Sequence, residues 1–211
     1  MSLYKTITVD PETKILIWKI EESFEELSCN IDLTQHCQER VANTKSDIHR
    51  RGFMSVRHLL AQEGYVDHDL YYDDKGKPHL RDGKHISITH SFEFSAIIIS
   101  SQEVGIDIEK QRDKILRIAN KFTPLEEYRT LANTEAVIRK LTIVWGGKEA
   151  IYKSYGHKQV SFLQHIYIED FDFDDGQTSG RVYFNGGIVD YSLYFLEFEG
   201  FTCVYALPTV V

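Results

Sequence analysis

Val104-Gly105-Ile106-Asp107-Ile108-Glu109-Lys110 is the stretch from which the fold can be worked out. Its β-branched residues predict a strand, and because side chains alternate along a strand, Asp107 and Glu109 project from one face. Two carboxylates on one face repel each other, which predicts a cation between them, and oxygen ligands favour Mg²⁺. This ion takes about six oxygens, some from water and phosphate, so a third protein carboxylate is expected. Alternatively, both acids are solvated at a sheet edge.

The composition is that of a globular protein and excludes several classes. The 211 residues are 42% apolar and 27% charged, and domains cluster near about 100 to 150 residues, so the chain forms one large domain or two small ones. A net charge of −8 argues against a general nucleic-acid binder, whose surface is normally basic. No apolar run approaches the roughly 20 residues of a membrane span.

Cysteine usage and the first residues predict a cytoplasmic protein. Cys29, Cys37 and Cys203 are scattered, lack metal-ligand spacing and are odd in number, which indicates reduced thiols. Residues 1–26 contain acids and lack the apolar core of a signal peptide.

The first half of the chain predicts helices and a small antiparallel sheet. We expect a hairpin over residues 5–20, an acidic helix over 21–27, a polar stretch over 34–46 and a stronger helix that ends at Gly64. Strands are expected over 86–91, 95–100 and 104–109. The basic residues of the stronger helix, among them Arg50, Arg51 and Arg57, form either a solvated face or an anion-binding one.

The second half repeats this character. Thr123 and Pro124 have the pattern of a helix start, and a longer helix is expected over 134–155, with Gly156 placed to end it. Strands are expected over 166–173, 180–184, 191–197 and 202–207. Because each half combines helices with a small sheet, the sequence predicts an α+β chain with two similar subdomains.

The long helix carries a second group of candidate residues. Glu149 and Lys153 are four apart and share one face, which is also the spacing of a simple surface ion pair worth about 0.2 to 0.5 kcal/mol. Gly146 and Gly147 weaken that simpler interpretation, since each costs roughly 1 kcal/mol in a helix interior. A helix with two glycines suggests close approach of a ligand, a metal or another backbone, so Glu149 is the candidate third carboxylate.

Together these motifs resemble those of the 4′-phosphopantetheinyl transferase superfamily, in its longer, single-chain Sfp-type branch. The resemblance rests on Gly-Ile-Asp-Ile-Glu at 105–109 followed by Trp-Gly-Gly-Lys-Glu-Ala-Ile-Tyr-Lys at 145–153. Upstream, Arg-His-Leu-Leu at 57–60, Gly-Lys-Pro at 76–78 and Ile-Thr-His-Ser at 88–91 are similar to family segments, as is Phe-Thr-Pro-Leu-Glu-Glu at 122–127.

The resemblance implies the fold and the activity of that family. The fold is α+β, with two similar subdomains, 1–103 and 104–211, each a small antiparallel sheet with packed helices, related by a pseudo-twofold with the active site at their interface. The implied enzyme is a monomeric holo-[carrier protein] synthase of fatty acid, polyketide or nonribosomal peptide biosynthesis. It moves the 4′-phosphopantetheine group of coenzyme A to a serine of an acyl or peptidyl carrier protein, depends on Mg²⁺ and releases 3′,5′-ADP. Nucleic acid and membrane are not among the implied partners.

The resemblance also implies roles for individual residues. The metal ligands are Asp107, Glu109 and Glu149, and the catalytic residues are Glu149, as a base directly or through water, Lys153 and Asp107. The residues that bind coenzyme A are Arg51, Arg57, Lys77, Pro78, Thr89, His90, Lys148 and Lys153. Attack of a serine hydroxyl on a pyrophosphate needs positioning, charge neutralisation and proton removal, which these residue types can supply.

Some positions depart from the family pattern. Thr89 stands where the family usually has Ser, and Gly146 replaces the commoner Thr, Ser or Cys. For the basic residue before the Arg-His-Leu-Leu helix, Arg51 competes with Arg40, Lys45 and Arg50. Two alternatives follow: a catalytically inactive module that binds coenzyme A or a carrier protein, and a structural α+β protein with solvated acids.

Overall fold

The computed structural model describes residues 2–124 and 133–209, which belong to two compact units, 1–102 and 103–211. The predicted division into 1–103 and 104–211 differs from these bounds by one residue. Within the described ranges, no helix is both long enough and apolar enough to cross a membrane.

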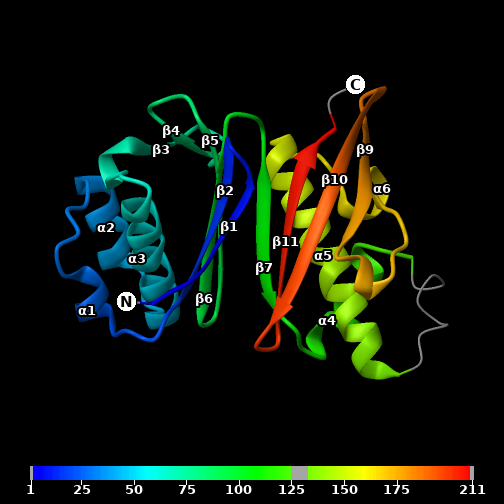
Figure 1. The fold of residues 1–211 in the computed structure, drawn as a ribbon, viewed down its shortest axis with the longest axis horizontal. Coiled ribbons are helices and arrows are strands. Elements are labelled where there is room, and N and C mark those ends of the chain that lie inside the picture. The colour runs from blue at the N-terminus through cyan, green and yellow to red at the C-terminus, as the bar shows by residue number, and fades with distance from the viewer. Residues whose placement is uncertain (1, 125–132, 210–211) are drawn as a thin grey trace. The chain divides into compact units, whose positions relative to one another are not determined.

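The first unit is a six-stranded antiparallel sheet with helices on one face (Figure 1). The strand order is β1-β2-β6-β5-β4-β3. The strands are β1 (Leu3–Asp10), β2 (Thr13–Lys19), β3 (Leu70–Tyr72), β4 (Pro78–Leu80), β5 (His85–Ser91) and β6 (Phe94–Ser100). The helices are α1 (Phe24–Ser28), α2 (Gln35–Asn43) and α3 (Asp47–Gln62), followed by a 3-10 turn, η1 (Asp67–Asp69).

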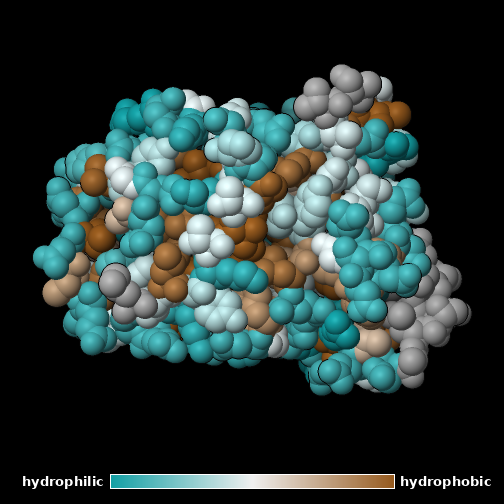
Figure 2. All heavy atoms as spheres, viewed as in Figure 1, coloured by the Kyte–Doolittle hydropathy of each residue, from teal (hydrophilic) through white to brown (hydrophobic). Residues whose placement is uncertain are grey.

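The helix α3 is held to this sheet by its apolar side. Its Leu59 and Leu60 are completely buried and share a core with Leu16 and Trp18 of β2 and Ile97 of β6. Burying a leucine side chain contributes about 1.5 to 3 kcal/mol, so this helix is stabilised mainly by its packing. On the face drawn in Figure 2, hydrophilic side chains cover most of the helical part of this unit.

The second unit is a five-stranded antiparallel sheet with a long helix on one face. The strand order is β7-β11-β10-β9-β8. The strands are β7 (Gly105–Lys110), β8 (Ile166–Ile168), β9 (Gln177–Phe184), β10 (Gly187–Phe198) and β11 (Phe201–Pro208). The helices are α4 (Lys114–Ile118), α5 (Thr134–Tyr155) and α6 (Phe162–His165), with 3-10 turns η2 (Ala119–Lys121) and η4 (Phe173–Asp175).

The helix α5 has well-defined ends. Its cap residue Asn133 accepts a hydrogen bond from the backbone N–H of Ala136, and Gly156 ends the helix with a φ of 72°, a left-handed conformation that suits glycine. Both the range 134–155 and the stop at Gly156 confirm the sequence prediction. Between its ends, Leu141 and Ile151 pack into the core on one side of the sheet.

The two units share one topology. In the first unit, β2 is followed along the chain by helices, and the strands after them complete the sheet order β2-β6-β5-β4-β3. In the second unit, β7 is followed by helices that include α5, and the strands after them complete the order β7-β11-β10-β9-β8. The strand β1 is the only addition to this pattern among the described strands. The predicted α+β fold with two similar subdomains, each an antiparallel sheet with packed helices, is therefore confirmed, and the pseudo-twofold stays a prediction.

Some elements differ from the expectation. The polar stretch 34–46 contains α2, whose cap residue Thr34 accepts from the N–H of Cys37, and the short strands β3 and β4 were not expected. The strand expected over 166–173 ends at Ile168, because acidic residues and the turn η4 follow it. The helix expected to start at Thr123 falls largely on residues outside those described.

Candidate active site

The site begins where β7 lies against α5. A side chain at Gly105 would place its Cβ 1.8 Å from the carbonyl oxygen of Ala150, so only glycine permits this approach of strand to helix. Beyond Gly105, the helix-facing side of β7 carries Asp107 and Glu109. The two acids were predicted to share one face of the strand, and that face packs against α5.

Asp107 forms an ion pair with Lys153 of α5. The ammonium of Lys153 lies 2.7 Å from Asp107 Oδ1 and donates a second bond of 2.9 Å to the carbonyl of Ile106. The Asp107 side chain is only 7% exposed, and a buried carboxylate needs such a charged partner. The ion pair of Lys153 is thus with Asp107 on the strand, whereas the helix spacing had offered a simple surface pair with Glu149 as the alternative.

Glu109 is contacted by the indole of Trp145. The Trp145 Nε1–H donates to Glu109 Oε1 over 3.3 Å. Glu109 also lines a cavity of 210 Å³ together with Trp145 and the basic side chains of Lys110, Arg112 and Lys114. The end of β7 therefore combines one carboxylate with several cations.

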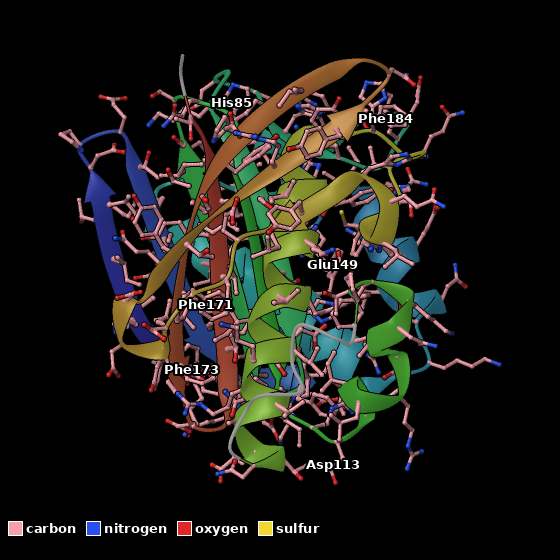
Figure 3. The ribbon with its side chains drawn as sticks, turned by 90° about the vertical axis from the view of Figure 1, so that its right-hand side faces the viewer. His85, Asp113, Glu149, Phe171, Phe173 and Phe184 are labelled. Carbon is pink, nitrogen blue, oxygen red and sulfur yellow. The ribbon has the colours of Figure 1, made fainter. Side chains whose placement is uncertain are left out.

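Glu149 lies near the middle of α5 (Figure 3) and has a strongly altered acidity. Its pKa is raised to about 7, mainly by burial and also by the negative charges of Asp107 and Glu109, against the opposing effect of Lys153. The three carboxylates consequently interact, and Glu149 can gain or lose a proton near neutral pH. Such a group is suited to accept a proton from a substrate hydroxyl.

This set of donors suits Mg²⁺ in its chemistry. Three carboxylates provide hard oxygen ligands, and their mutual repulsion, expressed in the raised pKa of Glu149, is what a divalent cation would relieve. No group of three or more His, Cys, Asp or Glu side chains forms a ready metal cage in the ranges that the structure describes. Mg²⁺ commonly keeps waters and substrate phosphates as ligands, so a complete protein cage is not required.

The two helix glycines allow close packing on the sheet. A Cβ at Gly146 would lie 2.9 Å from Val204 Cγ2 and 3.8 Å from Asp107 Oδ2, and one at Gly147 would lie 3.4 Å from Ile168. The absence of a side chain at Gly146 therefore lets α5 approach β11 beside the Asp107 carboxylate, and Gly147 lets it approach β8. This contact explains why glycine, and not the Thr, Ser or Cys that is commoner in the family, stands at position 146: a larger side chain would collide with Val204.

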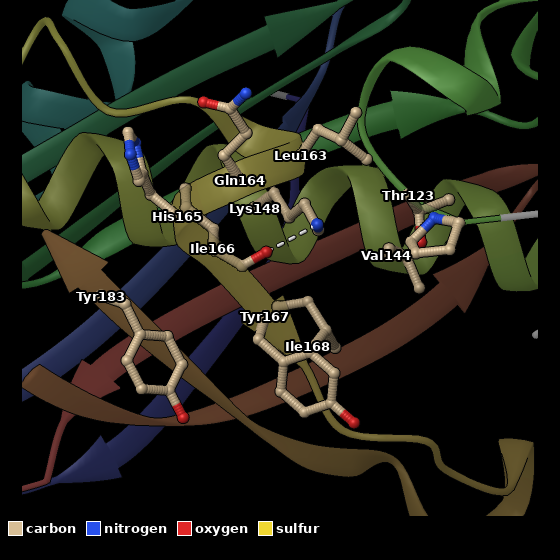
Figure 4. Close-up of a pocket in the computed structure, with 11 residues that line it drawn as sticks. Thr123, Val144, Lys148, Leu163, Gln164, His165, Ile166, Tyr167, Ile168 and Tyr183 are labelled. Atoms are coloured by element: carbon tan, nitrogen blue, oxygen red, sulfur yellow. Dashed lines mark hydrogen bonds between the residues drawn. The ribbon is translucent and has the colours of Figure 1, made fainter.

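Lys148 is bound to backbone carbonyls. Its ammonium donates to three backbone carbonyls, those of Phe122, Phe162 and Ile166, over 2.6, 2.8 and 2.7 Å (the last is drawn in Figure 4). The residue is 3% exposed and backs a cavity of 330 Å³. These contacts favour a role in holding α5 to α6 and β8, whereas its predicted contact with phosphate stays untested.

Two arginines predicted to bind coenzyme A have extensive contacts within the first unit. Arg57 is buried, and its Nε donates to Asp67 Oδ1 over 2.8 Å while its guanidinium lies over the Phe53 ring. The Asp67 carboxylate in turn accepts bonds from the backbone N–H and the hydroxyl of Thr34. Arg51 donates to the backbone carbonyls of Glu22 and Ile20.

The other predicted coenzyme contacts of the first unit fall at two places. On β5, Thr89 is buried and His90 is exposed, and the His90 ring packs over Gly52 of α3 and lies 5.8 Å from the ring of His49. Lys77 follows the Asp73 turn, where its backbone N–H donates to the Asp73 carboxylate, and Pro78 begins β4.

Arg50 is a candidate that the sequence only named as a competitor of Arg51. Its guanidinium lies over the Phe24 ring at 3.6 Å, and its Nε is buried without a hydrogen-bond partner among the described residues. It precedes Gly52, which supports His90. The sequence shows both arginines but does not say which of them can bind a ligand. The bonds of Arg51 to two backbone carbonyls leave Arg50 as the better candidate.

Comparisons with known proteins agree on one family. The family model of the 4′-phosphopantetheinyl transferase superfamily matches residues 103–206. The 4′-phosphopantetheinyl transferase gsp of Aneurinibacillus migulanus is 30% identical over 134 residues, which cover 62% of this chain and 54% of that protein. The 4′-phosphopantetheinyl transferase Sfp of Bacillus subtilis (strain 168) is 31% identical over 121 residues, 53% of this chain and 54% of that protein. The matches thus span about half the length of these relatives.

Proposed function

Because this chain belongs to the 4′-phosphopantetheinyl transferase superfamily, we propose that it transfers the 4′-phosphopantetheine group of coenzyme A to a serine of an acyl or peptidyl carrier protein. The observation that carries the proposal is the meeting of Asp107, Glu149 and Lys153 between β7 and α5, inside the matched range. A strand with two acids and a helix with an acid and a lysine together offer charge neutralisation and proton removal at one place.

The residues divide the chemistry between them. Glu149, with a pKa of about 7, takes the proton of the serine hydroxyl directly or through water. The serine oxygen then attacks the phosphorus that bears the pantetheine arm, and the bond from that phosphorus to 3′,5′-ADP breaks, so ADP leaves with the electron pair. Lys153 neutralises charge that develops on the phosphates, for which it exchanges part of its contact with Asp107.

Asp107, Glu109 and Glu149 would hold Mg²⁺. When bound, this ion neutralises the pyrophosphate and stabilises the leaving group. Because these three carboxylates and Lys153 are carried by β7 and α5, a bound ion would share one site with the lysine.

The first unit supplies the contacts to coenzyme A in this proposal. His90 and Thr89 on β5, with Lys77 and Pro78 at the start of β4, are the predicted contacts to the adenine and the 3′-phosphate. Arg50 is better suited than Arg51 to bind phosphate, because the Arg51 guanidinium already donates to two backbone carbonyls.

The carrier partner is proposed to dock on the basic surface around α4. Lys110, Arg112 and Lys114 surround the small cavity that Glu109 lines, and carrier proteins of this family are acidic. On a chain of net charge −8, a local group of cations is what such a partner needs. We further propose a cytoplasmic monomer without nucleic-acid or membrane partners.

The decisive experiment combines the protein with an apo carrier protein, coenzyme A and Mg²⁺, and follows the carrier by intact-protein mass spectrometry. We expect the carrier to gain the mass of one phosphopantetheine group. Asp107→Ala is expected to abolish the gain and Asp172→Ala, on an exposed aspartate of the same unit, to leave it unchanged.

Two results would count against the proposal. An unmodified carrier, tested with several carriers, would remove the transfer activity. Tight binding of coenzyme A that neither responds to Mg²⁺ nor leads to turnover would favour the catalytically inactive binding module instead.

A further inference from the structure

We propose that Trp145 is a positioning residue that orients the Glu109 carboxylate toward Mg²⁺, an inference that rests on the proposed function. The indole Nε1–H of Trp145 donates to Glu109 Oε1 over 3.3 Å. A hydrogen bond from a neighbouring group to a ligating carboxylate fixes its orientation and strengthens metal binding. Trp145 itself has no oxygen to offer a metal, so it acts through Glu109.

The indole is fixed by aromatic neighbours. The Trp145 ring lies edge-on to Phe122 at 5.1 Å between centroids and is tilted against Phe162 at 5.4 Å. Such packing leaves the donor little freedom, whereas Glu109 is partly exposed near the end of β7 and has a flexible side chain. The rigid group therefore determines the position of the flexible one.

The position of Trp145 on α5 connects it to the other proposed ligand. Trp145 and Glu149 are four residues apart on the helix and so share one face. The same helix turn that supplies Glu149 thus also sets the direction of Glu109. The geometry of two proposed ligands on different elements is thereby fixed by a single helix.

The first unit contains a matched control. Trp18 Nε1–H donates to Glu22 Oε2, also over 3.3 Å, in the unit that lacks the acidic group. The chain has two tryptophans, so each Trp→Phe variant removes one bond of the same chemistry and length and leaves the other in place.

The experiment measures Mg²⁺ binding without turnover. Trp145→Phe and Trp18→Phe are titrated with Mg²⁺ by calorimetry in the presence of saturating coenzyme A and without carrier protein. In Trp18→Phe, the emission of the remaining Trp145 reports the same titration. We expect about a tenfold rise in the Mg²⁺ dissociation constant for Trp145→Phe, the lower end for such supporting contacts because 3.3 Å is long for this bond, and no change for Trp18→Phe.

A second substitution guards against loss of folding. Benzothienylalanine, which replaces the indole N–H by sulfur with nearly the same shape, is incorporated at position 145 in the Trp18→Phe background. It keeps the packing against Phe122 and Phe162 and removes only the donor. A tenfold weaker Mg²⁺ affinity with this analogue supports the inference even if Trp145→Phe does not fold.

The failures are distinguishable. If the wild-type chain transfers phosphopantetheine with Mg²⁺, and Mg²⁺ affinity is unchanged in both the phenylalanine variant and the analogue, the positioning role is wrong and the proposed function stands. Transfer that proceeds equally well without Mg²⁺ overturns the inference together with the proposed metal site, and the transfer activity itself stands. If the wild-type chain modifies no carrier, the proposed function fails first.

Discussion

Replacing Glu149 with glutamine should stabilise the fold while removing the activity. Burial and the charges of Asp107 and Glu109 raise the pKa of Glu149 from 4.5 to about 7, which means that the ionised form is disfavoured in the folded protein. The substitution Glu149→Gln keeps the shape and removes the charge. The buried charge of Glu149 is therefore expected to reduce stability when no cation is bound.

The sign and the size follow from the two pKa values. Below about pH 4 the glutamate is protonated in both the folded and the unfolded chain, and the charge has no effect on the free energy of unfolding. As the pH rises from 4.5 toward 7, the unfolded chain ionises first and stability is lost. At pH 8 the loss amounts to about 3 kcal/mol, and it does not grow further.

The assay is urea unfolding of wild type, Glu149→Gln and Glu135→Gln at pH 4 and pH 8, without Mg²⁺. Glu149→Gln should exceed wild type by about 3 kcal/mol at pH 8 and match it at pH 4. Glu135 is exposed in the first turn of the same helix, so its variant should lose less than about 1 kcal/mol. Equal stability of wild type and Glu149→Gln at pH 8 would refute the inference that burial and the neighbouring carboxylates disfavour the ionised form of Glu149.

Further predictions concern the supports of the site and the partner surface. Gly105→Ala forces a Cβ against the carbonyl of Ala150 and should lower the free energy of unfolding by about 3 kcal/mol. Gly187→Ala, where the nearest atom to the new Cβ is at 3.4 Å, should lower it much less, and chemical denaturation of both variants tests the difference. Asp67→Ala leaves Arg57 as a buried charge without its carboxylate and should cost about 3 to 5 kcal/mol, and a thermal unfolding temperature equal to that of wild type would contradict this. Replacing both Arg112 and Lys114 with Glu should raise the KM for an acidic carrier about tenfold at low salt and leave the KM for coenzyme A unchanged. Steady-state kinetics with both substrates varied measures the two constants, and a rise in the KM for coenzyme A instead would contradict the docking role.

Much of the fold could be predicted because local patterns were strong. The helix 134–155 has an apolar face, a capping residue and a glycine stop, and all three act within a few residues of chain. The strands on either side of Gly200 were equally clear because both are rich in apolar and aromatic residues. The short strands β3 and β4, by contrast, have three residues each, and only pairing with each other and with β5 makes them strands.

The candidate site could be predicted in its acids but not in its pairings. Spacing placed Asp107 and Glu109 on one face, the helix glycines made Glu149 the candidate third carboxylate, and the resemblance added the roles of Glu149 and Lys153. That Lys153 reaches Asp107, and that Lys148 donates to three backbone carbonyls, depends on how the surrounding elements approach the helix. Spacing within one helix contains no information about that approach, and Gly105 reveals its importance only once Ala150 is placed beside it.

The repeated topology has a consequence for how each half of the chain tolerates change. The strand β2 has the same place in its sheet as β7, yet its helix-facing side carries Leu16 and Trp18, where β7 carries Asp107 and Glu109. If the halves arose by duplication, one copy has an apolar strand that packs the core while the other carries the acids proposed for the chemistry. Substitutions on the helix-facing side of β2 then need only keep the volume and the apolar character of the side chain. Substitutions on that side of β7 must also keep the carboxylate groups.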